Sequence, residues 1–291
     1  MGESPSNLML NWLRQRLSRE SAAWLDCQLE AVAKGGDREL HIALGLAPRR
    51  LGKADLELPG DDLAAAEAAR PGWDPSGWSV DQTARILVLV TVSDRPDFPE
   101  RFAEICRTAD VAEAVAFYRG LPLYAGPKRL QWQAGEGLRT NMRAVFEAVA
   151  HRSPYPREQF DQDRWNQMVL KALFIGSRLH PIQGLDQRAN AELAAILSDY
   201  AHERWAAGRD VSPELWRCVG PFAAGDALAD LERALEDGEA LERKAAALAL
   251  AASPAAEAAT LLARHRDLTD KLRSGALTWE SLAAELDRQQ R

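Results

Sequence analysis

The stretch Gly137–Arg209 decides the fold of this 291-residue chain: GLRTNMRAVFEAVAHRSPYPREQFDQDRWNQMVLKALFIGSRLHPIQGLDQRANAELAAILSDYAHERWAAGR. Apolar residues recur every three or four positions over 164–175 and over 191–207, which predicts two amphipathic helices. The loop between them, 176–190, combines two glycines and a proline with charged and amide side chains. Long connectors inside compact domains are often functional. We therefore expect a binding site of this chain to include that loop.

Helical periodicity continues toward the N-terminus. Helices are expected to begin near Ser4 and at a Ser21 cap, and a third is expected over 38–46, ended by Ala47-Pro48. The apolar run 86–92 has the composition of a buried strand. Because no second β-rich run is present to pair with it, a helix is the better prediction.

The remaining segments give the same signal. Further helices are expected at 61–70, 98–106 and 111–118, followed by a connector over 121–135. The last part, 226–291, is rich in Ala, Leu, Glu and Arg and predicts three helices. The total is about a dozen helices, mostly pairs joined by short breaks.

This pattern predicts an all-α protein built as an irregular HEAT-like helical array, because each amphipathic pair buries its apolar stripe against the next. A single globular all-α domain is the alternative. We expect one all-α unit over 1–291, with N-terminal helices in 1–120, a central core in 136–209 and C-terminal capping helices in 210–291. Strand–helix alternation and phosphate-binding loops of the GxGxxG or GxxxxGK[ST] type are lacking, which argues against a nucleotide-binding α/β fold.

Composition excludes several classes of function. The net charge is −7 and the arginines are scattered among acidic residues, which disfavours nucleic acid as a partner. Cys27, Cys106 and Cys218 are far apart without metal-ligand spacing, as expected for small hydrophobic residues in a reducing compartment. The sequence shows neither a signal peptide nor an apolar run long enough for a transmembrane segment. A cytoplasmic location is therefore expected.

The helix over 191–207 has a polar stripe, because Glu192, Asp199, His202 and Glu203 are spaced by three, four or seven residues. Two carboxylates and an imidazole within one turn suit acid–base chemistry or a divalent metal, with His180 as the one obvious further donor. The simpler interpretation is charge pairing on a solvent-exposed face.

The helix over 164–175 is expected to bury its apolar face, formed by Trp165, Val169, Leu170, Leu173 and Phe174. Lys171 is expected on the opposite side of this helix, between Leu170 and Ala172 in the sequence, in a chain where lysine is sparse. It either extends to water and pairs with a carboxylate such as Asp199, or serves as a desolvated reactive or phosphate-binding amine.

In the loop, Asp186 and Arg188 either hold the backbone together or converge on a ligand that carries hydroxyls or a carboxylate. Arg139 and Asn141, at the start of an earlier helix, are expected to face the same hollow. The sequence predicts that one pocket is shared by five residues, namely Lys171, His180, Asp186, Asp199 and His202.

Parts of the chain resemble the EboA-type metabolite-traffic family. Members of this family are encoded in bacterial gene clusters tied to the export of natural products such as scytonemin precursors. The stretches that carry the resemblance are Tyr118-Arg-Gly-Leu-Pro-Leu, Gly137-Leu-Arg-Thr-Asn-Met142, Asn166-Gln-Met-Val-Leu-Lys-Ala-Leu-Phe174, Ile182-Gln-Gly-Leu-Asp186 and Asp199-Tyr-Ala-His-Glu-Arg-Trp-Ala-Ala-Gly-Arg209. The resemblance implies a mostly helical cytoplasmic protein that acts with other products of its gene cluster. It supplies no catalytic residues.

Three hypotheses follow for function. The first is a non-enzymatic scaffold that binds a small polar metabolite or a partner protein in a central groove. The second is an enzyme that uses Asp199, His202 and Glu203 with His180 or Lys171, and the third is a structural subunit without a ligand. For the first we expect no cofactor, no metal and no catalytic residue, and ligand binding by Arg139, Asn141, Asn166, Lys171, His180, Asp186, Arg188, Asp199, His202 and Glu203.

Overall fold

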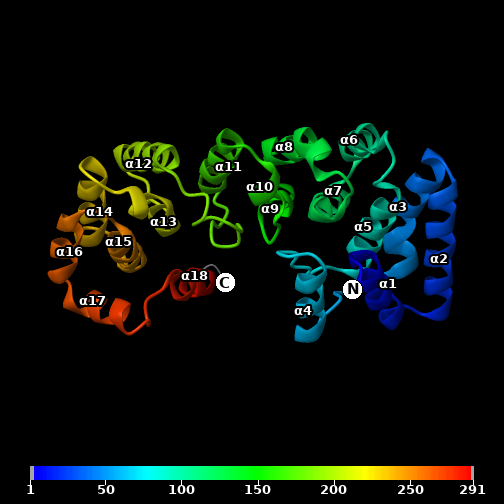
Figure 1. The fold of residues 1–291 in the computed structure, drawn as a ribbon, viewed down its shortest axis with the longest axis horizontal. Helices are drawn as coiled ribbons and strands as arrows, with labels where there is room; N and C mark the ends of the chain where they lie inside the picture. Colours follow the sequence, from blue (N-terminus) through cyan, green and yellow to red (C-terminus); the bar gives the residue numbers. More distant parts are fainter. Residues whose placement is uncertain (1–2, 290–291) are drawn as a thin grey trace. The chain divides into compact units, whose positions relative to one another are not determined.

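A computed structural model describes residues 3–289 of the chain. This part forms eighteen α-helices and four short 3-10 helices, with an isolated β-bridge between Asp55 and Ser79 and no β-strand. The predicted all-α class is confirmed, although the helices are more numerous than the dozen expected. The chain packs as two compact units, Met1–Arg164 and Trp165–Arg291, which are shown in Figure 1.

Unit 1 contains ten complete α-helices within its described residues. Their bounds are α1 Pro5–Arg16, α2 Arg19–Lys34, α3 Asp37–Leu51, α4 Gly60–Ala69, α5 Val80–Val92, α6 Phe98–Thr108, α7 Val111–Arg119, α8 Gln131–Arg139, α9 Arg143–Ala150 and α10 Tyr155–Gln159, with 3-10 helices η1 Leu121–Leu123 and η2 Pro127–Leu130. The segment 121–135, expected to be a connector, therefore holds both 3-10 helices and the start of α8.

Helix α5 is the core of unit 1. It packs against α1, α2, α3 and α7, and Figure 1 shows it between α3 and α7. Ile86 and Leu89 are completely buried. The apolar run 86–92 is thus a helix, as predicted. Its sequence resembles that of a buried strand because neighbouring helices cover almost the whole circumference of α5, so nearly every position is apolar.

Two predicted helix ends in unit 1 were wrong. Helix α2 begins at Arg19, because the Ser18 hydroxyl oxygen accepts a hydrogen bond from Ser21 N at 3.1 Å and so caps the helix three residues earlier than expected. Helix α3 continues through Pro48 to Leu51. A proline at this position leaves the Leu44 carbonyl without its helical donor, and the buried guanidinium of Arg85 supplies one, with Nε at 3.1 Å.

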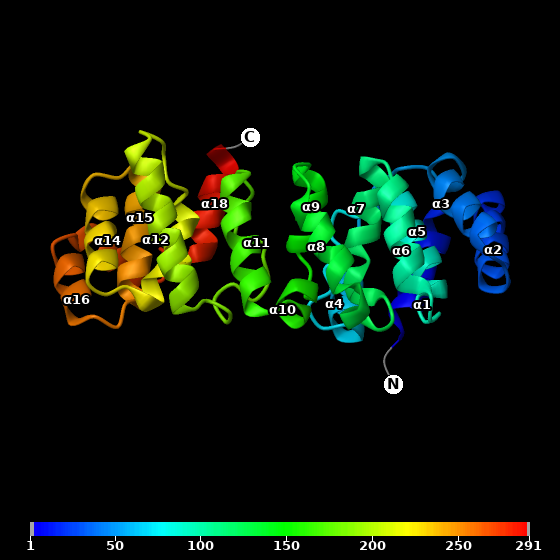
Figure 2. The ribbon, with the colours of Figure 1, turned by 90° about the horizontal axis from the view of Figure 1, so that it is seen from above.

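Helices α6, α7, α8 and α9 form the second part of unit 1. Helix α7 contacts α6 and α9, and α8 contacts the same two helices; Figure 2 shows α6, α7 and α9 running side by side. The Tyr118 ring of α7 packs closely against Gly137 of α8. A Cβ at this position would lie 2.7 Å from the Tyr118 ring and 2.9 Å from Val149, so the packing requires glycine.

Unit 2 begins within the first turn of α11, Gln162–Phe174. The following elements are α12 Ala191–Ala206, η3 Pro213–Leu215, α13 Trp216–Val219, η4 Gly220–Phe222, α14 Asp226–Glu236, α15 Ala240–Ala252, α16 Ala256–Ala263, α17 Arg266–Arg273 and α18 Trp279–Gln289. The two helices and the loop predicted for 164–207 are confirmed within one or two residues at each end.

Helix α15 is the centre of unit 2, since it contacts α13, α14, α16, α17 and α18 and is buried throughout Ala245–Leu250. Figure 2 shows α12, α14, α15 and α16 side by side. The C-terminal region forms five helices and not the predicted three. One unforeseen break separates α16 from α17, where the Thr269 hydroxyl donates to the Leu262 carbonyl at 2.8 Å and satisfies the end of α16.

Helix α11 differs from its prediction on one face. Trp165, Val169 and Leu173 are buried as expected, but the Phe174 side chain is 76% exposed, because the helix ends there and the chain turns away at Gly176. Within residues 3–289, no helix has the length and apolar character needed to cross a membrane.

Candidate functional site

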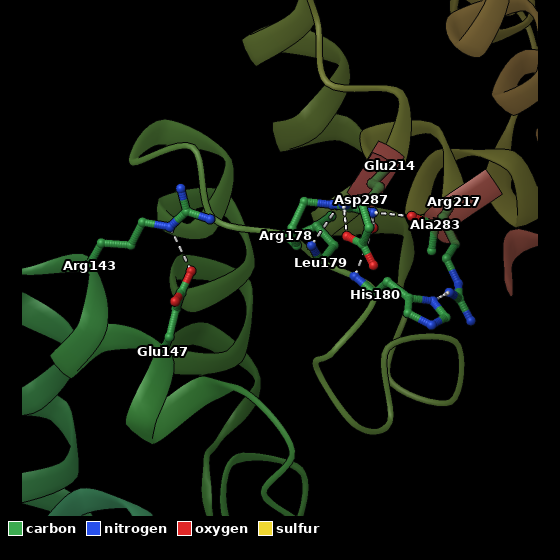
Figure 3. A network of polar contacts seen from close by, with 9 residues as sticks. All are labelled: Arg143, Glu147, Arg178, Leu179, His180, Glu214, Arg217, Ala283 and Asp287. Atoms are coloured by element: carbon green, nitrogen blue, oxygen red, sulfur yellow. Dashed lines mark hydrogen bonds and ion pairs between the residues drawn. The ribbon is translucent and has the colours of Figure 1, made fainter. Parts of the chain in front are cut away.

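The loop 176–190, called the central loop below, is fixed at its start by the buried carboxylate of Glu214 in η3. Glu214 accepts from Arg178 Nε at 2.8 Å and from Arg178 Nη2 at 3.2 Å (Figure 3). The same carboxylate accepts from the backbone N–H groups of Leu179 and His180, each at 2.9 Å. Four hydrogen bonds on one carboxylate satisfy its accepting capacity, so Glu214 has a structural role.

Arg178 extends this network to the last helix. Its guanidinium also donates to the Asp287 carboxylate and, at 3.3 Å, to the carbonyl of Ala283, both on α18 (Figure 3). Burial alone lowers the pKa of Arg178, but Glu214 and Asp287 outweigh this effect and raise it. The start of the central loop is therefore anchored on two sides by a permanently charged arginine.

His180 and Asp186 meet through Arg217 of α13. The Arg217 guanidinium donates to both Asp186 oxygens, at 2.6 and 2.7 Å, and to His180 Nδ1 at 3.3 Å. It also lies 5.7 Å from the Trp279 ring centre. Because an arginine has no acceptor, His180 Nδ1 is the acceptor in its contact. The structure thus brings two of the predicted residues together, around an arginine that the sequence analysis did not select.

The end of the central loop is held by amide groups. Asn190 caps α12, because its Oδ1 accepts from Leu193 N at 2.9 Å, and its Nδ2 donates to Asn166 Oδ1 at 2.9 Å. The Arg188 guanidinium stacks over the Trp165 ring at 4.7 Å. Asn166 and Arg188, both predicted to bind a ligand, have contacts here that secure the loop to α11.

The polar stripe on α12 faces solvent. Asp199 and Glu203 are exposed, and His202 Nε2 lies 2.7 Å from Asp230 Oδ1 on α14. Lys171 is partly buried on α11, and this burial lowers its pKa. In residues 3–289, no group of three or more His, Cys, Asp and Glu side chains is placed to hold a metal ion.

Of the five residues expected to share one pocket, His180 and Asp186 lie together, whereas His202 and Asp199 have other surroundings. His180 and Asp186 contact Arg217, His202 contacts Asp230, and Asp199 lies on the exposed face of α12. A cavity of about 310 Å³ does lie beside the central loop. Its lining contains none of the ten predicted residues and comprises Leu173, Gly176, Ser177, Arg178, Tyr200, Arg204, Asp210, Val211, Ser212, Pro213 and Leu286. Ligand binding by the ten residues stays a prediction.

Arg139 and Asn141 belong to unit 1, at the turn between α8 and α9. Both are exposed, and Arg139 forms a salt bridge with Glu136. A larger cavity, of about 670 Å³, lies beside this turn. It is open to solvent on one side and lined by residues of helices α6 to α9 and the segments between them, and we call it the unit 1 cavity. Its lining residues are Ala103, Glu104, Cys106, Arg107, Ala109, Ala114, Tyr118, Trp132, Gln133, Glu136, Gly137, Thr140, Met142 and Val145.

The unit 1 cavity has a polar floor made of neutral groups. Gln133 Nε2 donates to the Tyr118 hydroxyl at 2.8 Å, and both side chains are buried. Burial raises the pKa of the Cys106 thiol to about 12, although hydrogen bonds from Tyr118 and Gln133 lower it in part. Burial likewise raises the pKa of Tyr118. Thiol and phenol are therefore both protonated at neutral pH.

Two large apolar side chains at the same cavity are exposed. Trp132 is 64% exposed and Met142 is 50% exposed. The cavity falls in the volume range of small-molecule sites, and its combination of apolar walls with a few convergent polar groups is typical of them. The sequence analysis did not identify it, because Cys106, Tyr118 and Gln133 come from three separate helices without a motif.

A comparison with known families matches residues 5–220 to the family described as metabolite traffic protein EboA. The chain belongs to the EboA family. This result confirms the resemblance found in the sequence. A search of curated proteins and a search of solved structures gave no match.

The EboA match covers all the residues that line the unit 1 cavity. It also covers the central loop, Glu214 and Arg217. It ends before α14, so Asp230 and Asp287, the partners of His202 and Arg178, lie beyond the matched range. Tyr118, Gly137 and Met142 of the cavity belong to stretches that carried the resemblance.

Proposed function

We propose that this EboA-family protein is a non-enzymatic binding protein that holds a small metabolite in the unit 1 cavity during its traffic. The observation that supports this function is the cavity of about 670 Å³ with exposed Trp132 and Met142 at its wall and the buried pair Gln133–Tyr118 at its floor. Exposed tryptophan and methionine side chains around a hollow are a feature of surfaces that become covered on binding.

The proposal includes the predicted partners and compartment. A traffic protein must receive its metabolite and release it, so we place other proteins of the same gene cluster next to it, in the cytoplasm. The helical units offer extended surfaces for such contacts. The central loop, with His180 and Asp186 held by Arg217, is proposed as a second contact region for a polar metabolite or a partner protein.

The alternative of an enzyme that uses Asp199, His202 and Glu203 with His180 or Lys171 gains no support from the contacts. Acid–base catalysis needs these groups within hydrogen-bond reach of one substrate position. His202 instead contacts Asp230, and His180 contacts Arg217. We therefore favour the binding function.

Native mass spectrometry of the protein purified gently from its host tests the proposal. We expect a fraction of the protein to carry a small-molecule mass that is lost on denaturation. The variant Ala103→Trp, which fills the cavity from α6, should lose this mass. The matched control Ala112→Trp, at an exposed position of α7 outside the lining, should retain it.

The outcomes separate the hypotheses. A bound mass present in wild type and in both variants would place the ligand elsewhere and overturn the assignment to this cavity. Co-purified proteins with no small molecule in any sample would instead support a scaffold without a metabolite.

A further inference from the structure

We infer that a groove between α3 and α7 binds an amphipathic helix of a partner protein, whose acidic flank faces α3. The groove has a volume of about 680 Å³. Residues within 38–49 of α3 form one wall, Arg85 of α5 forms the floor, and Asp110 and Glu113 at the start of α7 form the other wall. We call it the α3 groove. It shares no lining residue with the unit 1 cavity, so this inference goes beyond the proposed metabolite site and does not depend on it.

The floor of the α3 groove connects its two walls. Arg85 is only 3% exposed, and its Nε donates to the Leu44 carbonyl of α3 at 3.1 Å. Its Nη2 lies 3.7 Å from the Glu113 carboxylate of α7, and Figure 1 shows α5 between α3 and α7. Because these contacts are made within the chain itself, the groove is already formed without a partner.

The α3 wall has the pattern of a helix–helix contact. Ile42 is 39% exposed, and Leu46, one turn further along, is partly exposed. Arg38, Gly45 and Arg49 lie on the same face as these two residues, because steps of four, seven, eight and eleven residues return to one side of a helix. At 1.5 Å per residue this stripe is about 16 Å long, or three turns. Its length and its apolar centre suit a helical partner.

Gly45, near the middle of the stripe, has no role in the packing of the chain. The residue is exposed within α3, and a Cβ at this position would have no other atom within 4 Å. Glycine inside a helix lowers stability relative to alanine, so the free fold does not benefit from it. A residue without a side chain does allow another backbone to approach closely. The partner helix therefore lies over Gly45, with apolar side chains against Ile42 and Leu46.

The charges of the two walls specify the flanks of the partner helix. The guanidinium groups of Arg38 and Arg49 are exposed, and within residues 3–289 they form no ion pair. The acidic groups of the opposite wall are already engaged, since Asp110 accepts from Glu113 N at 2.8 Å and Glu113 accepts from Asp110 N at 3.2 Å. A helix with acidic residues on its α3 side and neutral or basic residues on its α7 side complements both walls. Nucleic acid, which is negative on all sides, would be repelled by the α7 wall.

Selection from a peptide library tests the inference. The library consists of 18-residue helical peptides on phage, with a fixed leucine stripe and with Glu, Gln or Lys encoded at random along both flanks. We expect the peptides selected by the wild-type protein to carry Glu along one flank. In fluorescence anisotropy, such a peptide should bind about 3- to 10-fold more tightly than its Gln counterpart, as for two exposed ion pairs, and the Lys counterpart should bind more weakly still.

A variant at Gly45 separates binding from folding. Gly45→Leu fills the α3 groove and should weaken the selected peptide at least 10-fold. Its melting temperature should be equal to or above that of the wild type, because leucine favours the helix and has open space here. The matched control is Gly60→Leu, at another exposed glycine with open space around its Cβ, which should leave binding unchanged.

Charge reversal tests the acidic flank. The double variant Arg38→Glu/Arg49→Glu should invert the preference, so that the Lys peptide binds more tightly than the Glu peptide. The control Arg19→Glu/Arg266→Glu makes the same change of net charge at exposed positions outside the groove and should retain the preference for Glu.

Selected peptides that carry Glu and Lys equally, peptides that bind Gly45→Leu as tightly as the wild type, or a library without any binder would overturn the inference. A wild-type dimer that Gly45→Leu converts to a monomer would assign the groove to a second copy of this chain. Binding to phosphatidylglycerol vesicles that the double variant loses would assign it to a membrane surface. Failure to find a native metabolite would contradict the proposed function and leave the result for the α3 groove unchanged.

Discussion

Glu214 and Arg178 form a buried ion pair, with 2.8 Å between Glu214 Oε2 and Arg178 Nε and side chains that are 5% and 11% exposed. They stand 36 residues apart in the chain, and the pair determines where the central loop begins. Arg178 has one further counter-charge, Asp287, whose side chain is 62% exposed. Removing Glu214 therefore leaves the buried guanidinium with a single solvent-exposed acidic partner.

We therefore predict that Glu214→Ala destabilises unit 2 by about 3–5 kcal/mol, the range for breaking a buried pair. Urea unfolding followed by circular dichroism measures this change. Asp270→Ala is the control, because it removes a carboxylate from the solvent-exposed pair with Arg273 and should change stability by less than about 1 kcal/mol. Similar small effects for both variants would show that Glu214 does not anchor the loop.

Two glycines of α8 should respond in opposite ways to alanine. Gly137→Ala places a methyl group 2.7 Å from the Tyr118 ring and should destabilise unit 1 by about 1–3 kcal/mol through overpacking. At Gly135 the nearest atom would be Arg164 Nε at 3.5 Å, an ordinary contact, so Gly135→Ala should stabilise the helix by about 0.5–1 kcal/mol. Denaturation midpoints of the two variants measure both effects, and equal shifts would contradict the tight packing of the Tyr118 ring against Gly137.

Much of the fold follows from local patterns. The apolar period of α11 and α12 and the polar character of the loop between them predicted these elements within one or two residues. The end of α3 was mispredicted because a residue remote in sequence, Arg85, supplies the donor that Pro48 lacks. Local rules describe a proline as a helix terminator, and only tertiary packing shows the exception.

The candidate site was harder to predict for a similar reason. The sequence identified His180 and Asp186 from the composition of their loop, but their common partner Arg217 lies in a helix of four residues without a distinctive pattern. The unit 1 cavity combines Cys106, Tyr118 and Gln133 from three helices. Such groups become neighbours only through helix packing, and the spacing of these residues in the sequence does not indicate that they are neighbours.

His202 should prove to be a structural residue. Asp230 is buried, and its Oδ2 has no hydrogen-bond partner in the described chain. The contact of its Oδ1 with His202 therefore stabilises this buried carboxylate. We predict that His202→Ala lowers the unfolding free energy by about 1 kcal/mol, a modest value because the histidine is half exposed. The neighbouring Glu203→Ala, on the exposed face, should change it by less than about 0.5 kcal/mol. If His202→Ala instead leaves stability unchanged and abolishes metabolite binding, a functional role replaces the structural one.

Glu242 on α15 makes the stability of unit 2 depend on pH. Burial raises the pKa of its carboxyl above the usual 4.5; the Trp216 indole lowers this pKa in part, and Asp210 raises it further. A raised folded-state pKa means that the neutral form is favoured on folding. The stability that the Glu242 carboxyl contributes to unit 2 is fully present below its unfolded-state pKa. This contribution is lost as the pH rises through its folded-state pKa.

We predict that Glu242→Gln, a neutral replacement of similar shape, raises the melting temperature by a few degrees at pH 8, where the wild-type carboxyl is charged, and has little effect at pH 4. Thermal melts of both proteins from pH 4 to pH 8 measure the difference. Glu257→Gln, at an exposed position of α16, should show no such trend. A lower melting temperature of Glu242→Gln at pH 8 would mean that attraction to Arg233 exceeds the penalty of burying the charge.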